Sequence, residues 1–206
     1  MDFDSSNDYV DFGTNLLENT PNNGTITMWV YFKNLDNTYD MLFSKREDKN
    51  NRFFLQRQRS EYPYDGGDKG NKLRWGINRD GASYTETFSD NSMTEDTWYH
   101  ISVYWGSQGM GMYVNGIKQT INNDTFTGTP NFTNGSSHAL IGQTTTSDFS
   151  HAANFKVSEF AIYGTVLNES EINNIILNGP VPVPEPLNIF LLLSGLLFAV
   201  VYKSFQ

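Results

Sequence analysis

Aromatic and hydrogen-bonding side chains gather in and around one Gly-rich stretch of the sequence. Proteins that bind sugars stack an aromatic ring on the pyranose face and bond its hydroxyl groups with amides and carboxylates. The residues that could do this chemistry are Tyr62, Tyr64, Asp65, Asn71 and Trp75, with Arg57 nearby. The alternative is that Trp75, in the segment LRWGI, faces the core and that the tyrosines only pack within their loop. The residues alone leave both interpretations open.

The residue patterns of common catalytic sites are missing from the chain. No G-x-S-x-G nucleophile elbow occurs, and the histidines lack the H-E-x-x-H spacing of zinc proteases. Retaining glycosidases hold two carboxylates about 5 Å apart on fixed elements. Glu61, Asp65 and Asp68 instead stand in a Gly-rich stretch that cannot fix their positions. We therefore expect no enzyme activity.

Charge and cysteine content exclude further classes of function. Lys and Arg number 14 against 23 Asp and Glu, which gives a net charge of −9. Phosphate binding needs clustered Lys and Arg, so a nucleic-acid partner is not expected. The chain has no cysteine, which excludes disulfides, thiolate nucleophiles and Cys-type zinc sites.

Alternation of apolar and polar residues dominates the chain. In TITMWVYF the apolar residues Ile26, Met28, Val30 and Phe32 share one face, which is typical of a half-buried strand. Similar runs cover residues 40–45, 52–58, 72–78, 83–89, 98–105, 138–144 and 155–163. Many such strands with almost no helix predict an all-β sandwich or barrel.

Two local signals are more specific. Asn115 and Gly116 separate two alternating segments, and Asn-Gly supplies the two positive φ angles that a two-residue type I′ hairpin turn needs. In NESEINNIILNG, Asn168 and Glu171 form the spacing of a capping box, and Gly179 can end the helix. The sequence therefore predicts one hairpin and one short helix after the last strand.

The order of these segments resembles the laminin-G-like (concanavalin A-like) jelly roll. The resemblance rests on FDSSNDYVDFG (3–13), TITMWVYF (25–32), LFSK (42–45), TWYHISVYW (97–105), MYVNGIKQ (112–119), HALIGQ (138–143) and FKVSEFAIYGTVLNESEI (155–172). It implies two antiparallel sheets packed face to face in one domain, residues 1–178. It also implies that Trp29 and Trp98, which match tryptophans of the family, are packing anchors.

The same resemblance implies one Ca²⁺, held between the N-terminal segment and the final strand. Asp4, Asn7 and Asp8 match the first part of that site, while Ser158 stands where the family carries Asp, and Glu159 follows it. Calcium takes six to eight hard oxygen ligands, so carboxylates with backbone carbonyls are chemically adequate. The alternative is a turn whose Asp and Asn side chains bond their own backbone.

The C-terminal residues differ from everything before them. Residues 179–186 contain VPVPEP, a stiff proline-rich spacer, and residues 187–206 hold 16 mostly apolar residues, LNIFLLLSGLLFAVVY, before Lys203. As a helix these span about 24 Å, close to the thickness of a membrane core. The order of spacer, apolar segment and basic end resembles the PEP-CTERM sorting signal, whose motif here is Pro184, Glu185 and Pro186. The resemblance implies a transmembrane helix and processing by an exosortase; a simple membrane anchor is the alternative.

These inferences together predict an exported, non-enzymatic protein of a Gram-negative bacterium. We expect it to be anchored in the inner membrane before processing and then to lie at the cell surface or in the matrix, where its lectin-like domain binds a glycan or an extracellular polysaccharide. A structural matrix protein without a specific ligand is the alternative, and a concanavalin A-like polysaccharide hydrolase is the third reading. Export normally needs a leader and none is visible, so the gene is expected to extend upstream of Met1.

Overall fold

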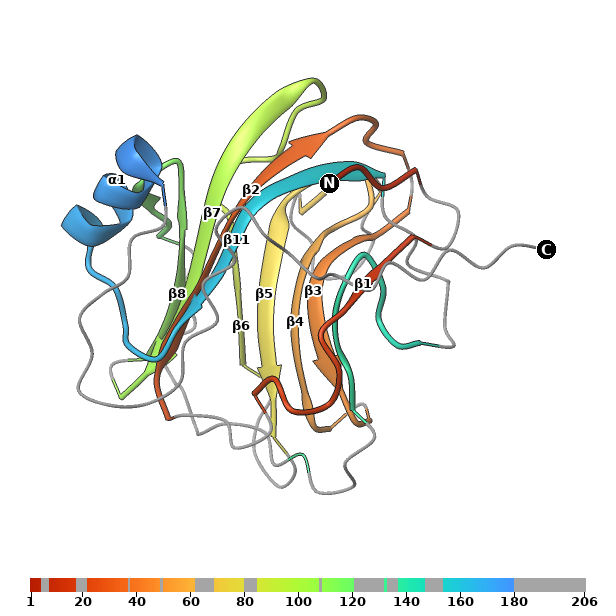
Figure 1. The fold of residues 1–206 in the computed structure, drawn as a ribbon. Coiled ribbons are helices and arrows are strands. Elements are labelled where there is room, and N and C mark those ends of the chain that lie inside the picture. The colour runs from red at the N-terminus through yellow and green to blue at the C-terminus, as the bar shows by residue number, and fades with distance from the viewer. Residues whose placement is uncertain are drawn as a thin grey trace.

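Two antiparallel sheets face each other in the computed structural model, and a helix lies at one side (Figure 1). The structure describes residues 1–4, 8–17, 22–36, 38–48, 50–61, 69–79, 85–107, 109–120, 132, 137–146 and 154–179. The predicted sorting signal and the segment 187–206 lie outside these residues. Within the described parts, no helix is long and apolar enough to cross a membrane.

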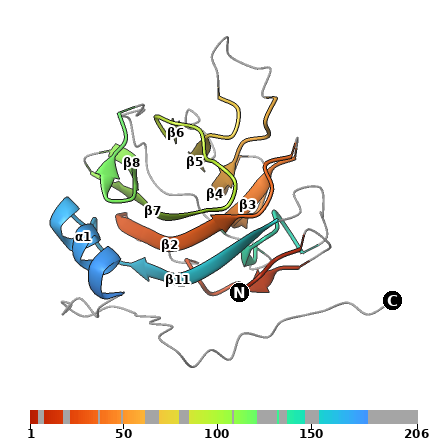
Figure 2. The ribbon, with the colours of Figure 1, turned by 90° about the horizontal axis from the view of Figure 1, so that it is seen from above.

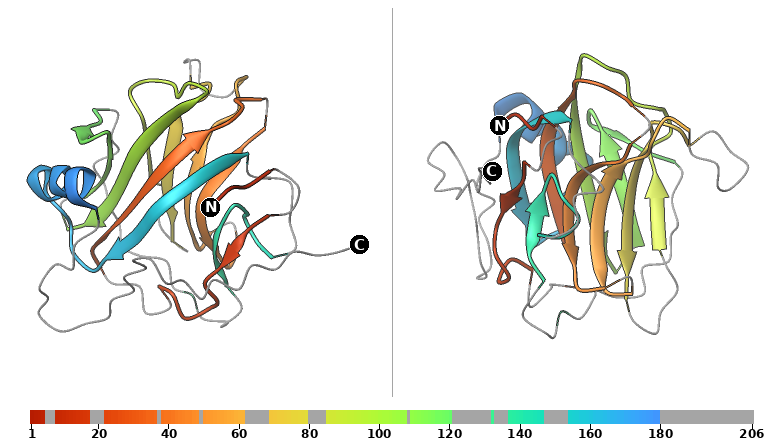
Figure 3. Two further views of the ribbon diagram at one scale, coloured as in Figure 1. Left: turned by 45° about the horizontal axis from the view of Figure 1, so that its top comes forward. Right: turned by 90° about the vertical axis from the view of Figure 1, so that its right-hand side faces the viewer.

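The two sheets contain six and five strands and are seen in turn in the two views of Figure 3. The six-stranded sheet has the order β1 (Val10–Asp11), β10 (Ala139–Ile141), β3 (Asp40–Arg46), β4 (Arg52–Arg57), β5 (Leu73–Asn78) and β6 (Thr85–Phe88). The five-stranded sheet has the order β11 (Phe155–Tyr163), β2 (Gly24–Phe32), β7 (Thr97–Gly106), β8 (Gly109–Val114) and β9 (Ile117–Lys118). The predicted jelly-roll sandwich is confirmed.

Aromatic side chains from both sheets meet in the interior. Phe53 on β4 stacks on Trp75 of β5 with ring centroids 5.7 Å apart. The ring of Trp105 on β7 lies 5.3 Å from the Phe53 ring. All three side chains are fully buried. Their rings join the two sheets, since burial of apolar surface is the main force that holds a sandwich closed.

Alternation assigns each residue of β2 and β7 to one side of the five-stranded sheet. Met28 on β2 and Ile101 on β7 are register partners, and both are fully buried in the core. Trp98 has the opposite parity to Ile101 and is 44% exposed on the outer face, where its ring lies 5.5 Å from that of Tyr31. The prediction of Trp98 as a packing anchor is therefore wrong. Trp29 is half-buried against His100 on the same outer face.

Both local predictions are confirmed. Asn115 and Gly116 have φ angles of 50° and 77°, and the hairpin that they close pairs β8 with β9. The helix α1 (Glu169–Asn178) begins with a complete capping box, in which the Asn168 side chain accepts from the Glu171 amide and the Glu171 carboxylate accepts from the Asn168 amide.

Helix α1 covers one end of the outer face of the five-stranded sheet (Figure 2). Ile172 and Ile175 are buried there with three tyrosines that point outward from the sheet. These tyrosines are Tyr104 on β7, Tyr113 on β8 and Tyr163 on β11. The helix thus turns part of an outer face into a second, smaller core and leaves the end with Trp98 uncovered.

His100 makes the stability of the fold dependent on pH. Its side chain is buried, and burial lowers the pKa of the imidazole from 6.5 to about 4. Between these pH values the His100 imidazole is protonated in the unfolded chain but not in the folded chain. The free energy of unfolding therefore falls as the pH drops from 6.5 towards 4. The full effect is roughly 3 kcal/mol.

We predict that the His100→Gln variant loses less stability over this pH range than the parent protein. Urea unfolding at pH 7, 5.5 and 4 measures the difference, because the contribution of the carboxylates is common to both proteins. Parallel pH profiles for the two proteins would show that His100 does not titrate as described.

Candidate functional site

A groove lies on the outer side of the five-stranded sheet, beside the start of α1. It has a volume of about 750 Å³ and is formed by residues just before β2, the β7–β8 hairpin, β9 and the connection from β11 to α1. Its lining among the described residues is Asn22, Asn23, Tyr104, Gly106, Ser107, Gly109, Tyr113, Lys118, Thr165, Val166, Leu167 and Asn168. Aromatic, amide and hydroxyl groups therefore surround one hollow.

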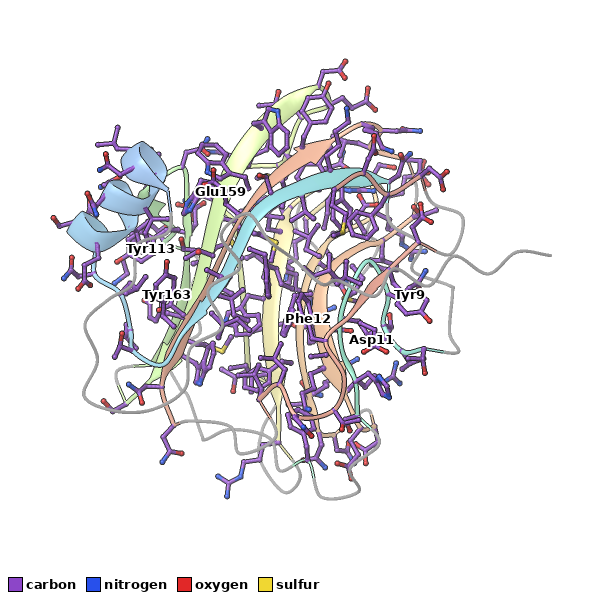
Figure 4. The ribbon with its side chains drawn as sticks, in the orientation of Figure 1. Tyr9, Asp11, Phe12, Tyr113, Glu159 and Tyr163 are labelled. Atoms are coloured by element: carbon purple, nitrogen blue, oxygen red, sulfur yellow. The ribbon has the colours of Figure 1, made fainter. Side chains whose placement is uncertain are left out.

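Two tyrosines contributed by neighbouring strands lie at the base of the groove. The rings of Tyr104 and Tyr113 are 6.0 Å apart and inclined by 49°. Gly111 is the register partner of Tyr104, and a Cβ atom on this glycine would lie 2.4 Å from the Tyr104 hydroxyl oxygen. Tyr104 can therefore lie flat on the strand only because residue 111 has no side chain. Figure 4 shows Tyr113 next to α1, with Tyr163 nearby.

One wall of the groove is tied to β2 by a side chain. Thr25 Oγ1 donates to the carbonyl oxygen of Thr165 at 2.8 Å and accepts from the amide of Leu167 at 3.0 Å. Thr25 is fully buried, so this link is shielded from water. The link fixes the segment that leads into α1, and with it the side chains of Thr165 and Asn168 at the groove.

Lys118 supplies the cation of the groove. It is the register partner of Tyr113, and its Nζ lies 6.0 Å from the centroid of the Tyr104 ring. Burial raises the pKa of the Tyr113 hydroxyl while the positive charge of Lys118 opposes the shift, so Tyr113 remains a neutral donor at neutral pH. No carboxylate occurs among the described lining residues.

The described members of the sequence-predicted sugar-binding set, Asn71 and Trp75, do not line the groove. Tyr62, Tyr64 and Asp65 fall outside the described residues. Trp75 is fully buried, and its indole Nε1 donates to the carbonyl oxygen of Tyr104 at 3.3 Å. No face of its ring reaches solvent, so the prediction that Trp75 contacts a sugar is wrong. Asn71 adopts a left-handed backbone conformation, with a φ of 58°.

The side-chain oxygen of Asn71 already has a structural role. It accepts from Arg57 Nη1 at 3.0 Å. Arg57 is fully buried, and its Nε lies 2.5 Å from Asp40 Oδ2, which is equally buried. Asn71 and Arg57 therefore belong to a polar network that joins β3, β4 and the start of β5, because a buried cation needs its partners.

The structure separates Glu159 from Asp4, another residue of the predicted calcium site. Asp4 follows the segment that pairs with Phe155–Val157, where Asp2 bridges to Lys156. Glu159 lies on β11 in the other direction, about 16 Å from Asp4 at the usual rise per residue. Figure 4 places Glu159 towards α1, away from Tyr9, the neighbour of Asp8.

A smaller part of the predicted calcium set remains near the N-terminal segment. The Asp8 Oδ2 accepts from the Asp4 amide at 3.3 Å, as in the alternative turn, and Asn7 lies outside the described residues. Among the residues that the structure describes, no group of three or more acidic or histidine side chains could hold a metal ion. Glu159 therefore lies too far from Asp4 to share one ion with it.

The groove was missed because its residues are distant in sequence. The alternation of β7 and β8 places Tyr104 and Tyr113 on the outer face, and this much can be predicted from the pattern. Nothing in the sequence indicates that Asn22, Thr165 and Lys118 meet beside them. Only the register of β11, β2, β7, β8 and β9 brings these segments together.

Comparison with known proteins gives one family and several similar folds. The chain matches the concanavalin A-like lectin/glucanases superfamily, with a laminin G profile, over residues 4–173. The native heptameric SAP-like pentraxin from Limulus polyphemus has a TM-score of 0.58 at 13% identity, over 88% of this chain and 83% of the pentraxin. No curated protein matches the sequence significantly.

Two enzymes contain a similar domain. Domain 4 of AbnA, a GH43 extracellular arabinanase from Geobacillus stearothermophilus in complex with arabinotriose, has a TM-score of 0.53 at 15% identity, over 75% of this chain and 66% of that domain. A Trypanosoma rangeli sialidase in complex with 2,3-difluorosialic acid has a TM-score of 0.53 at 18% identity. The match covers 75% of this chain but 22% of the sialidase. At these identities the similarity is one of fold.

The floor of the groove can be tested by filling the space under Tyr104. We predict that Gly111→Ala destabilises the protein by about 1–3 kcal/mol, because the new methyl group overlaps the Tyr104 ring. In a Tyr104→Ala background the same substitution should cost much less, since the ring is gone. Urea unfolding of the four proteins measures this coupling; additive effects would mean that Tyr104 does not lie on Gly111.

Proposed function

The chain belongs to the concanavalin A-like lectin/glucanases superfamily, and on this basis we propose that it is a non-enzymatic, lectin-like module that binds glycans in the groove beside α1. The observation that carries the proposal is the lining of that groove. Two tyrosines stand among amides and hydroxyls in a hollow of about 750 Å³. Ligand sites in proteins are commonly of this size and combine aromatic surface with a few polar groups.

The chemistry of the lining matches that of a sugar. A saccharide presents apolar C–H faces and hydroxyl groups that both donate and accept. Tyr104 and Tyr113, which are 8% and 7% exposed, border the hollow with small parts of their rings and hydroxyl groups. Asn23 carries an amide that donates and accepts, and the amide nitrogen of Asn168 is a donor, while its oxygen caps α1. The tyrosines are held by strands and a packed helix, so the site loses little freedom when a ligand binds.

The absence of a carboxylate from the described lining favours binding over hydrolysis. Glycoside hydrolysis uses a pair of carboxyl groups on either side of the scissile bond, and the groove offers Lys118 as its charged group among the described residues. We therefore propose a binding protein and not a hydrolase. A structural matrix protein without a specific ligand stays the competing proposal.

The proposal places this module outside the inner membrane of a Gram-negative bacterium. Its support is the sequence of the tail, where Pro184, Glu185 and Pro186 precede the apolar segment 187–206. An exosortase-type protease would process the chain there, after the apolar segment has held it in the membrane. Calcium at Asp4, Asn7 and Asp8 stays a prediction from resemblance, without Glu159 as a partner.

We predict that blocking the groove abolishes binding. Ser107 lines the groove in the β7–β8 turn, so Ser107→Trp should fill it and weaken binding of any glycan that the parent protein captures on an array by tenfold or more. Ser158→Trp introduces the same side chain on exposed β11 and should leave binding unchanged. If only Ser158→Trp loses binding, the site lies instead on the outer face near Trp29. If the parent protein binds no glycan on the array, the result favours a structural protein without a specific ligand.

The role of the tail is tested in a host that contains an exosortase. We predict that the full chain, exported with a suitable leader, is released from the membrane fraction with a loss of mass. Replacement of Pro184, Glu185 and Pro186 by alanine should leave it membrane-bound and uncut. Equal release of both proteins would contradict the sorting signal, and retention of both would favour the simple anchor.

A further inference from the structure

We propose that the groove selects anionic saccharides and that Lys118 is the residue that selects them. The ligand class is a glycan that carries an anionic group, either a carboxylate, as in a uronic acid, or a sulfate ester. This inference rests on the proposed function and narrows it from glycans in general to acidic ones.

The distribution of charge at the groove is the first observation. The chain as a whole is strongly acidic, with a net charge of −9, yet no Asp or Glu occurs among the described residues that line the groove. The remaining described lining groups are neutral, so Lys118 sets the sign of the local potential. An anion in the groove meets a cation without a fixed carboxylate beside it, in a hollow that concentrates the field.

The position of Lys118 is fixed from both sides along the backbone. Before it stands the tight turn at Asn115 and Gly116, and its own register partner is Tyr113. After it, the amide of Gln119 donates to the carbonyl oxygen of Met112 at 2.9 Å. The Cα of Lys118 cannot shift far, so its exposed side chain starts from a fixed point at the groove, and its Nζ lies 6.0 Å from the centroid of the Tyr104 ring.

The partners of Lys118 differ from those of Lys33 and Lys45. Lys33 pairs with Asp2 at 2.6 Å, and Lys45 is buried with its Nζ on the carbonyl oxygen of Ser137. Within the described parts of the chain, Lys118 forms no ion pair and contacts the Tyr104 ring instead. Its Nζ therefore keeps donors for a ligand, because a ring face accepts charge but no conventional hydrogen bond.

A nearby carboxylate does not cancel this charge. Glu169 opens α1 and raises the pKa of the Tyr113 hydroxyl, but it is the weakest of the causes, after burial, Lys118 and Tyr104. Glu169 does not line the groove. The neutral hydroxyls of Tyr104 and Tyr113 and the amide of Asn168 can donate to an anionic oxygen that Lys118 attracts.

Binding of three matched ligands to the full chain tests the proposal. The probes are an oligosaccharide of uronic acid residues, its neutral form with reduced carboxyl groups, and an oligosaccharide of the same length that carries sulfate esters and no carboxylates. Calorimetric titrations compare the parent protein with Lys118→Gln, Lys118→Arg and Lys156→Gln, which makes the same charge change on β11, away from the groove.

The expected result is that the parent protein binds an anionic probe at least tenfold more tightly than the neutral one. Lys118→Gln should remove this preference and retain residual binding of the neutral form, Lys118→Arg should restore most of the preference, and Lys156→Gln should leave it intact. The carboxylated and sulfated probes show which anion is the better ligand.

Three outcomes would overturn the inference. Equal affinity for charged and neutral probes, with binding still blocked by Ser107→Trp, would leave a glycan site without charge selection. Equal losses in Lys118→Gln and Lys156→Gln would assign the preference to net charge and not to the groove. If no probe binds, and no glycan on the array does, the proposed function itself fails together with this inference.

Discussion

The strict alternation of side chains along β-strands is the constraint on which this structure depends. Outside the register shifts in β3 and β11, the longer strands send alternate residues into the shared interior, so the remainder must lie on an outer face. In the five-stranded sheet the outer residues include large aromatic rings such as Tyr104, Tyr113 and Trp98. Rings of this size leave apolar surface in water unless another element covers them.

Helix α1 covers only some of these rings, and the groove is a consequence of that incomplete cover. The helix buries Ile172 and Ile175 against the tyrosines, but the segment that leads into it stands away from the β7–β8 hairpin. The hollow between them is bordered by Tyr104 and Tyr113, of which only small parts reach solvent. The proposed binding site thus lies at the boundary between a covered and an uncovered part of one sheet, on elements that the core already holds in place.

Local features of the fold could be read from the sequence because each depends on residues close together in the chain. The capping box of α1 needs only Asn168 and Glu171, and the hairpin needs only Asn115 and Gly116. The site could not be read, since its walls come from before β2, from β7–β9 and from the segment before α1. Trp75, the predicted sugar contact, illustrates the same limit. The sequence shows that the residue is aromatic, whereas the face of the sheet on which its ring lies depends on the register of neighbouring strands.

The pairing of the N-terminal residues with β11 has a consequence for how molecules of this protein meet. β11 lies at the border of its sheet, and an open border strand offers unpaired amides and carbonyls to which a second chain can add. Phe3 and Met1 occupy these groups at Phe155 and Val157, and further along the strand Glu159, with a φ of 52°, interrupts the regular ladder. Addition of a second chain along this edge is thereby disfavoured, so that copies of the protein meet an edge that is already occupied.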